Sequence, residues 1–541
     1  DGKQSLADMD KLIGKGYSPI VADDIISEPY AKGRKFTSRP DDPYNKVTIE
    51  SLSGDLQLFD GRMNHNNGWF VLRSNIKPGV TKGAVKWIIT PNVVADWMYQ
   101  PVIQTSQIGY HPAQDKEAVI EMDIRDNRKE TAQIIRIDAD GEKVVKNVTP
   151  ANWGKFLRYN YLKVDFTDVK EPGLYKIKYD TSVSPIFRID NDVYARGVWQ
   201  PVLEYFLPVQ MCHMRVNEKY RVWHDCCHMD DAQMAPAHNH IDGYDQKEGL
   251  SKFKPGEVVP GVNIGGWHDA GDFDLRIESQ AGESYILALA YEAFHPNLDV
   301  TSIDQINRVT EIHQPDGKND LLQQVENGAL TVVNGYLALG RLYRGIICND
   351  LRQYVLLGDA AAMTDGKIGN EDDRWIFTED NPGRELSTAA QLAAVSRVLK
   401  GFNDTLSVHC LDIARKVYAS TGNGNNRALF PKVQAAVELY LTTGEQPYMD
   451  FILDNKELII KQIGRIGWYT ARVEKQFAQM KNKKAKAFST AFRKALTGYE
   501  QELNKQVQET PYGIPYRPHI WGAGWDIQRF GFQHYFLCLL Y

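Results

Sequence analysis

The stretch GGWHDAGDFD, residues 265–274, is the strongest local signal in this 541-residue chain. It is a glycine-hinged turn that carries a tryptophan, a histidine and three carboxylates. Asp269 and Asp272 are three residues apart, a spacing that brings two carboxylates to one side of a tight turn. Carboxylates so close cannot ionise independently, which tunes their pKa values for proton transfer. The alternative is that one of them caps a helix that begins near Ser279.

The sequence pattern changes near residue 190, well before this turn. Between about residues 45 and 190, alternating stretches such as KVTIESL, AVIEMDI and LYKIKYD predict strands separated by turn residues. After about residue 192, apolar residues recur every three or four positions, as from Leu322 to Tyr343 and from Leu386 to Leu399. Such strands are typical of a β-sandwich, and successive amphipathic helices of an all-α toroid or bundle. We therefore predict a β-rich module, a β-sandwich and a helical domain over residues 1–98, 99–190 and 191–541.

The overall composition narrows the function classes. Hydrophobic residues make up 43% and charged residues 24% of the chain, as in folded globular proteins. The net charge of −6 argues against a nucleic-acid or anionic-membrane partner, and no stretch is long and apolar enough to span a bilayer. The chain begins DGKQSLAD, which predicts a mature secreted, periplasmic or cell-surface protein whose leader was removed.

All six cysteines follow residue 211. This distribution excludes a disulfide scaffold, in which cysteines are dense and spread along the chain. Cys212, Cys226 and Cys227 lie near one another in the sequence, beside several histidines. The crowding hints at a metal site.

The 265–274 stretch closely resembles the signature of glycoside hydrolase family 9, the inverting endoglucanase family. PVIQTSQIGYHP (101–112) and GLYKIKYDTSVSPIFRI (173–189) resemble the first and last strands of the immunoglobulin-like domain that precedes many catalytic domains of this family. The resemblance covers roughly residues 100–541. It implies an immunoglobulin-like sandwich over 99–190, followed by a barrel of six helical hairpins, (α/α)6, over 191–541.

The resemblance also implies a reaction. Family members hydrolyse β-1,4-linked glucans by a single displacement with inversion, so cellulose-like glucan, mixed-linkage glucan and xyloglucan are the expected polysaccharide substrates. Asp272 matches the general base, and Asp269 matches the partner that helps hold the attacking water. Trp267 is expected to support the turn and the floor of the substrate cleft.

One part of the family pattern has no match. The family's general acid is a Glu near the end of the catalytic domain, and no residue of this chain matches it. The final segment, GFQHYFLCLLY, resembles a late-middle helix of the barrel. We therefore expect the chain to be a fragment whose remaining part supplies the acid. The alternative is that the resemblance does not extend to catalysis.

The resemblance points to a structural zinc ion held by two Cys and two His. Thiolate and imidazole in a closed tetrahedral set are what structural zinc prefers. For one of the two cysteine ligands, Cys226 is an alternative to Cys227, and for one of the two histidine ligands, His238 and His240 are alternatives to His268. The alternatives to a metal site are a buried cysteine cluster or a Cys212–Cys226 disulfide. Calcium sites also occur in the family, and no position for one is evident. The predicted zinc ligands are Cys212, Cys227, His228 and His268.

A second conspicuous stretch is PYGIPYRPHIWGAGWDIQRFG, residues 511–531. Its aromatic rings could line sugar subsites, since rings stack on sugar faces. The alternative is packing inside the barrel, which is favoured for Trp525. Together with Trp267 of the signature stretch, the predicted substrate-binding residues are Tyr516, Arg517, His519 and Trp521.

Three functions are consistent with these features. The first is an endo-acting β-1,4-glucanase, favoured because the paired-carboxylate turn is intact. The second is an exo-acting relative that releases glucose, cellobiose or an amino sugar from a chain end. Exo action requires a loop that blocks one end of the cleft, and the insertion between His228 and Gly265 is a candidate for that loop. The third is a non-catalytic glycan-binding protein that lost the acid. No organic cofactor is implied.

Overall fold

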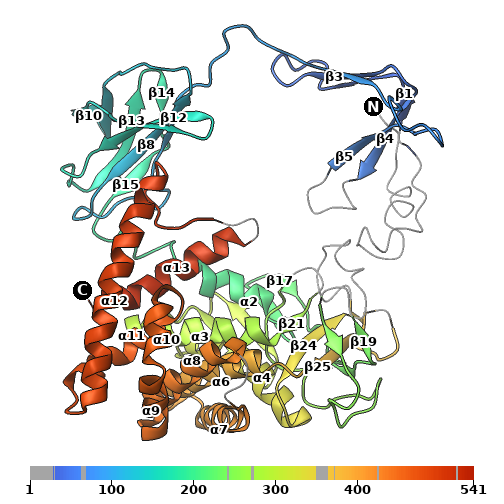
Figure 1. The fold of residues 1–541 in the computed structure, drawn as a ribbon, viewed down its shortest axis with the longest axis vertical. Coiled ribbons are helices and arrows are strands. Elements are labelled where there is room, and N and C mark those ends of the chain that lie inside the picture. The colour runs from blue at the N-terminus through green and yellow to red at the C-terminus, as the bar shows by residue number, and fades with distance from the viewer. Residues whose placement is uncertain are drawn as a thin grey trace.

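The structure, a computed structural model, describes residues 29, 31–61, 69–239, 243–269, 273–348, 364–370, 372–422, 426–518 and 522–540. Figure 1 shows small sheets near the N-terminus, then a β-sandwich and then a helical domain. The predicted fold class, β-rich parts followed by a helical domain, is confirmed.

The N-terminal module consists of two three-stranded antiparallel sheets with strand orders β1-β4-β5 and β2-β3-β6. Among its described residues, Leu56 and Phe59 are the buried apolar side chains, so its core is small. The strands are β1 (Ala31–Gly33), β2 (Lys35–Ser38), β3 (Val47–Ser51), β4 (Leu56–Gly61), β5 (Trp69–Arg73) and β6 (Trp87–Pro91).

The sandwich packs a five-stranded sheet, β10-β9-β13-β14 with β15 also on β13, against a four-stranded sheet, β11-β12-β8-β7. Alternate residues of each strand point into its core: in β13, Tyr175, Ile177 and Tyr179 are buried. The strands are β7 (Val102–Gln104), β8 (Glu117–Asp123), β9 (Ala132–Asp138), β10 (Gly141–Val148), β11 (Ala151–Phe156), β12 (Tyr159–Asp165), β13 (Gly173–Tyr179), β14 (Ser182–Val183) and β15 (Phe187–Ile189).

Five helices of the helical domain pack side by side in the order α3, α6, α8, α11, α13. The rings of Phe294 on α3, the first helix of the row, and of Tyr535 on α13, the last, lie 4.9 Å apart. The row of helices therefore curves back on itself. Four of these helices pair with the helix that follows in the chain, which forms helical hairpins. The bounds are α3 (Ile277–Phe294), α4 (Asp320–Leu339), α6 (Pro382–Leu399), α7 (Asp404–Ser420), α8 (Asn426–Thr443), α9 (Gln446–Asp454), α10 (Lys456–Lys461), α11 (Ile463–Gln479), α12 (Lys483–Gln506) and α13 (Ala523–Cys538), preceded by the π-helical turn η3 (Val202–Phe206) and α2 (Leu207–Gln210).

A polar cap begins helix α4 and a glycine ends it. The Asn319 side chain accepts hydrogen bonds from the backbone of Leu321 and Leu322 at the start of α4. Gly340, with φ of 77°, ends the same helix, since this backbone conformation favours glycine. The predicted apolar stripe from Leu322 is therefore correct as far as Leu339, and its extension to Tyr343 is wrong, because Tyr343 begins strand β24.

The helical domain also contains strands, so the prediction of purely helical structure after residue 192 needs correction. Two four-stranded sheets have the orders β17-β16-β23-β22 and β18-β25-β24-β21. Several partners lie far apart in the sequence, and local periodicity does not reveal such pairs. The strands are β16 (Arg215–Glu218), β17 (Arg221–His224), β18 (Gln233–Met234), β19 (His238–Asn239), β20 (Asp245–Gln246), β21 (Leu275–Arg276), β22 (Thr301–Asp304), β23 (Val309–Ile312), β24 (Tyr343–Cys348) and β25 (Arg374–Thr378).

A buried ionic network ties the helices together. Glu438 of α8 is 0% exposed and accepts hydrogen bonds from Tyr285 of α3 at 2.6 Å and Arg397 of α6 at 2.7 Å. Arg472 of α11 donates to it as well. Both arginines also pair with Glu292 of α3. One carboxylate thus links four helices. No helix among the described residues is long and apolar enough to cross a membrane.

Candidate active site

The signature turn lies directly before α3 and is anchored to the segment before β16. The backbone N–H of Cys212 donates to the carbonyl of Gly266 at 2.9 Å, and that of His268 donates to the carbonyl of Gln210 at 2.8 Å. These bonds tie the turn to the end of α2 and to the segment that follows it.

Trp267 lies beneath the turn. It is 2% exposed, and its Nε1 donates to the side chain of Gln324 on α4 at 2.8 Å. Its backbone exchanges two hydrogen bonds of 2.8 Å with the side chain of Gln280 on α3. This burial fits the expected role of Trp267 in supporting the turn. Trp267 also lines a small cavity beside the turn, and its contact with substrate stays a prediction.

Asp269 is exposed, with its carboxylate 3.6 Å from Nε of Arg276. Partial burial, and then the charge of Glu278, raise the pKa of Asp269 above its ordinary value. Asp269 does not cap the following helix, because α3 begins at Ile277 and its N-cap is Arg276. Asp272 lies outside the described residues.

Two cavities lie near the turn, and the described residues of the turn line only the smaller one. The larger, about 500 Å³, is lined by residues from the first ten positions of α3, α6, α8 and α11 and by residues of α13. It therefore lies toward the N-terminal ends of the first four helices, and we call it the barrel-mouth cavity. The smaller, about 70 Å³, is lined by Trp267, His268 and Asp269 of the turn. Ser279 and Glu283 of α3 line both cavities, which places the turn at the edge of the barrel mouth.

Glu283 was not singled out by the sequence. Burial, and then the carboxylate of Asp269, raise the pKa of Glu283 to about 7. The one sequence feature that points to Glu283 is a carboxylate at the seventh position of a largely apolar helix. This feature is weak, because solvent-exposed glutamates are common at such positions. The walls of the larger cavity also carry the rings of Phe430, Trp468 and Phe532.

The second predicted substrate-binding segment is only partly described. Arg517 is exposed and pairs with Glu509, with Nε to Oε2 at 2.7 Å. The Tyr516 ring lies 6.0 Å from that of Phe530. Neither side chain is among the residues that line the barrel-mouth cavity. His519 and Trp521, and the side chain of Trp525, lie outside the described residues.

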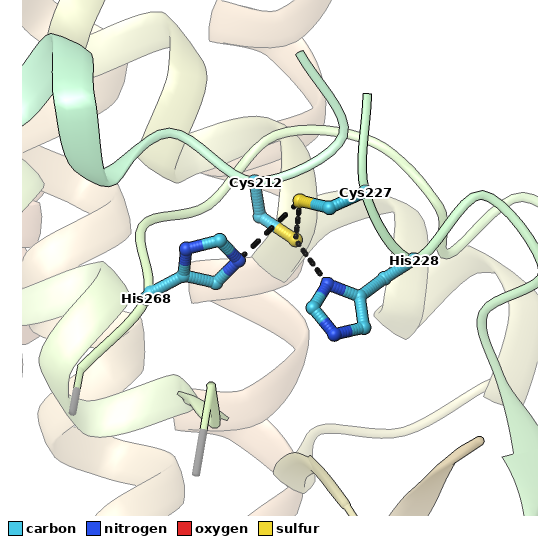
Figure 2. A group of neighbouring side chains, drawn as sticks. All are labelled: Cys212, Cys227, His228 and His268. Carbon is cyan, nitrogen blue, oxygen red and sulfur yellow. Dashed lines mark hydrogen bonds between the residues drawn. The ribbon is translucent and has the colours of Figure 1, made fainter. Parts of the chain in front are cut away.

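The four predicted metal ligands come together. Figure 2 shows the two sulfurs and two imidazoles of Cys212, Cys227, His228 and His268 directed at one another. All four residues are buried, and their ligand atoms lie within 4.8 Å of one another. Cys212 Sγ is 3.8 Å from Cys227 Sγ and 3.7 Å from His228 Nδ1, and Cys227 Sγ is 3.5 Å from His268 Nε2.

The structure distinguishes among the competing ligands. Cys226 is only partly buried, and its sulfur lies 3.8 Å from the carbonyl oxygen of Arg308 rather than in the cluster. Cys212 and Cys226 are both free cysteines, so the alternative of a disulfide between them is excluded. Burial lowers the pKa of His228 and of His268, which favours the neutral imidazole that a metal ion requires. The side chain of His238 and all of His240 lie outside the described residues.

Three charged or ionisable side chains surround this cluster, and sequence reasoning missed all of them. Arg374 NH2 lies 3.1 Å from Cys212 Sγ, and its Nε donates to Asp231 Oδ1 at 3.0 Å. His213 Nε2 lies 2.8 Å from Asp231 Oδ2. The sequence offered one signal, the arginine at the start of the mostly apolar strand RWIFT. An arginine in such a strand is expected to be buried, and buried arginines are almost always paired with another charged or polar group.

A second group of possible ligands consists of carboxylates. Oxygens of Asp230, Asp365 and Asp372 lie within 4.8 Å of one another. Asp365 and Asp372 also accept backbone hydrogen bonds within their own loop. Oxygen ligands of this kind suit calcium or magnesium rather than zinc.

Comparisons with known proteins agree with this architecture. A family model described as glycosyl hydrolase family 9 matches residues 202–541, and one described as cellulase N-terminal ig-like domain matches residues 98–184. The xyloglucan-specific endo-beta-1,4-glucanase BoGH9A of Bacteroides ovatus is 24% identical over 455 residues, 78% of this chain and 72% of that protein. Endoglucanase D of Acetivibrio thermocellus is 19% identical over 66% of this chain and 54% of its own length.

Solved structures share the fold. A metagenome-derived glycoside hydrolase family 9 endoglucanase superimposes with a TM-score of 0.60 at 19% identity, over 81% of this chain and 80% of its own. A Zn-binding triple mutant of the family 9 endoglucanase J30 superimposes with a TM-score of 0.59 at 19% identity, over 80% of this chain and 78% of its own. Because the first family model covers more than half of the chain, and the signature turn lies at the mouth of the helical barrel, this protein is a member of glycosyl hydrolase family 9 that carries the cellulase immunoglobulin-like domain.

Proposed function

We propose that the protein is an endo-acting hydrolase of β-1,4-linked glucans that inverts the anomeric configuration. The observation that carries this proposal is the position of the signature turn, with Asp269 on a small cavity that shares Ser279 and Glu283 with the barrel-mouth cavity. A sugar in the larger cavity would lie beside the paired-carboxylate turn.

The walls of the barrel-mouth cavity suit a carbohydrate. Sugars present apolar faces to aromatic rings and hydroxyl groups to polar side chains. Phe430, Trp468 and Phe532 supply rings, and Gln391 and Gln434 supply amides. Curated relatives are described as endoglucanases, one of them specific for xyloglucan, which supports β-1,4-glucan and includes xyloglucan among the candidates.

In the proposed reaction, Asp272 takes a proton from water and Asp269 helps to hold that water. The water oxygen attacks the anomeric carbon while the bond to the leaving oxygen breaks on the opposite side. The leaving oxygen takes its proton from a carboxylic acid outside the turn, and no residue of this chain matches the family position of that acid. Polymeric glucans do not cross membranes, so we place this activity outside the cytoplasm.

We also propose that Cys212, Cys227, His228 and His268 hold a structural zinc ion. With Zn–S near 2.3 Å and Zn–N near 2.05 Å, tetrahedral geometry requires about 3.8 Å between two sulfurs and about 3.6 Å between sulfur and nitrogen. The distances of 3.8, 3.7 and 3.5 Å fit these values. Four protein ligands leave no open position, so the ion would hold His268, and with it Asp269, in place.

A glycosyl fluoride tests the base without the acid, because fluoride leaves without protonation. Purified protein would be given β-cellobiosyl fluoride, with fluoride release followed by an ion-selective electrode and the product anomer by NMR. We expect α-cellobiose, and a rate about 100- to 10,000-fold lower for Asp272→Asn. Asp412→Asn, a change of an exposed carboxylate on α7, is the matched control and should leave the rate unchanged.

Polymer assays separate the remaining functions. An endo-acting enzyme lowers the viscosity of carboxymethylcellulose, barley glucan or tamarind xyloglucan faster than it releases reducing ends. Release of one small sugar with little loss of viscosity would instead support exo action. Neither fluoride release nor polymer cleavage by the wild-type protein, together with retained glucan binding, would overturn the enzymatic proposal in favour of a glycan-binding protein.

A further inference from the structure

Asp231 is a buried hub between the side chains of Arg374 and His213. It is 5% exposed, and it pairs with Arg374 through both carboxylate oxygens and with His213 through Oδ2. Arg374 and His213 are themselves 2% and 0% exposed. The three residues come from separate parts of the chain: His213 and Asp231 flank the β16–β17 hairpin, and Arg374 begins β25.

Arg374 and His213 hold opposite ends of the signature turn. His213 Nδ1 donates to the carbonyl of Gly265, 3.0 Å away, at the start of the turn. Arg374 NH1 donates to the carbonyl of Phe273, near its end. Asp269 lies between these anchors, and Phe273 is covalently joined to Asp272. Asp231 therefore organises both ends of the turn.

Arg374 reaches the metal cluster as well. Its NH2 lies 3.1 Å from Cys212 Sγ, close enough for a charge-assisted hydrogen bond to a thiolate. Partners of this kind orient metal ligands and stabilise their charged form. One guanidinium thus contacts a predicted zinc ligand, the hub carboxylate and the backbone of the turn.

We propose that Arg374 is a positioning residue that couples metal binding at Cys212 to the geometry of the catalytic turn. The inference rests on the zinc site proposed above and goes beyond it. The four ligands alone would connect the metal to the first half of the turn, through His268 and through the hydrogen bond from the Cys212 N–H to the carbonyl of Gly266, whereas Arg374 reaches Phe273 near the other end. With Arg374 in place, movement of Cys212 on metal loss also disturbs the hydrogen bond to Phe273 and the pairing with Asp231.

The test compares three variants of the whole protein. Arg374→Met removes all the donors and keeps much of the apolar stem, whereas Arg374→Lys keeps one charge and loses the planar fork. Arg397→Met is the matched control, because the Arg397 side chain is only 15% exposed and also pairs with carboxylates, but it belongs to the Glu438 network. The measurements are zinc per chain, the rate of zinc release to a chromogenic chelator, the spectrum of the cobalt-substituted protein, and kcat and KM on β-cellobiosyl fluoride.

We expect Arg374→Met to release zinc about 10- to 100-fold faster and to lower kcat by a similar factor, with KM changed less than about threefold. The thiolate-to-cobalt charge-transfer band should shift, since a hydrogen bond to Cys212 is lost. Arg374→Lys should recover part of each effect. Arg397→Met should lose thermal stability and keep wild-type zinc release, cobalt spectrum and KM.

Three outcomes would overturn the inference, and they are distinguishable. A wild-type protein that holds no zinc removes the proposed metal site and the coupling with it. A wild-type protein that holds zinc, beside a folded Arg374→Met variant with unchanged zinc release and cobalt spectrum, removes the coupling alone. Equal effects in Arg397→Met would assign the changes to general loss of packing and also contradict the proposal.

Discussion

Cys227 Sγ lies 3.5 Å from His268 Nε2, and His268 is the residue directly before Asp269. A ligand of the proposed metal site is therefore joined by one peptide bond to a residue of the proposed catalytic pair. Any loosening of the metal cluster reaches the turn through this bond. The relationship explains why a structural ion would matter for activity without contacting substrate.

The first prediction concerns the two adjacent cysteines. Cys227→Ser should lose zinc and lower the thermal midpoint by roughly 5–15 °C, because metal binding energy is folding energy and each kcal/mol shifts the midpoint of a large domain by about 2–4 °C. Zinc is measured by plasma emission and the midpoint by calorimetry. Cys226→Ser changes the neighbouring sulfur, which lies outside the cluster, and should keep both values. Equal losses in the two variants would show that the cluster is not the metal site.

The second prediction concerns pH. The pKa of Glu283 is raised to about 7 in the folded protein, so the folded state holds a proton that the unfolded chain releases above its ordinary pKa near 4.5. Stability from this group is thus fully present below about pH 4.5 and is lost as pH rises through about 7. Glu283→Gln, which carries no charge at any pH, should narrow the difference in thermal midpoint between pH 5 and pH 8.

A control separates this site from the rest of the protein. Glu248→Gln changes an exposed glutamate and should leave the difference between pH 5 and pH 8 as in the wild type. If Glu283→Gln behaves in the same way, the folded protein holds Glu283 ionised at neutral pH, contrary to the prediction.

The third prediction concerns the close approach of α4 to the turn. A Cβ added at Gly328 would lie 2.2 Å from Ser284 Oγ and 2.4 Å from the ring of Trp267. Gly328→Ala should therefore destabilise the protein by about 1–3 kcal/mol and lower kcat, because Trp267 supports the turn. Gly498→Ala on α12 meets no atom within 4 Å and should stabilise by about 0.5–1 kcal/mol. Thermal midpoints and fluoride release measure both effects; a neutral Gly328→Ala would mean that the indole can move aside.

The fourth prediction concerns the Glu438 network. Glu438→Gln leaves Arg397 and Arg472 short of a buried counter-charge, and breaking such a pair costs about 3–5 kcal/mol. The matched change is Glu445→Gln, which breaks the exposed pair with Arg415 and should cost at most about 1 kcal/mol. The unfolding midpoints of the two variants in urea, monitored by tryptophan fluorescence, give the comparison. Similar midpoints for both variants would mean that the network adds no stability.

The sequence by itself determined the broad organisation and the chemistry-bearing residue types. Alternation predicted the strands of the N-terminal module and the sandwich, and the 3.6-residue period predicted helices such as α4 and α6. The 265–274 stretch indicated the family, now shown by the comparison. Both periodicities are local, because they follow from which face of one element is buried.

Only the tertiary structure decided which residues meet. It distinguished Cys227 from Cys226, placed His268 beside residues about 40 and 56 positions earlier, and brought Arg374 to Cys212 from 162 positions away. It also paired β16 with β23 and assigned Trp267 to the interior. Contacts between distant segments depend on how whole elements pack, and packing complementarity leaves no period along the chain from which a partner can be identified.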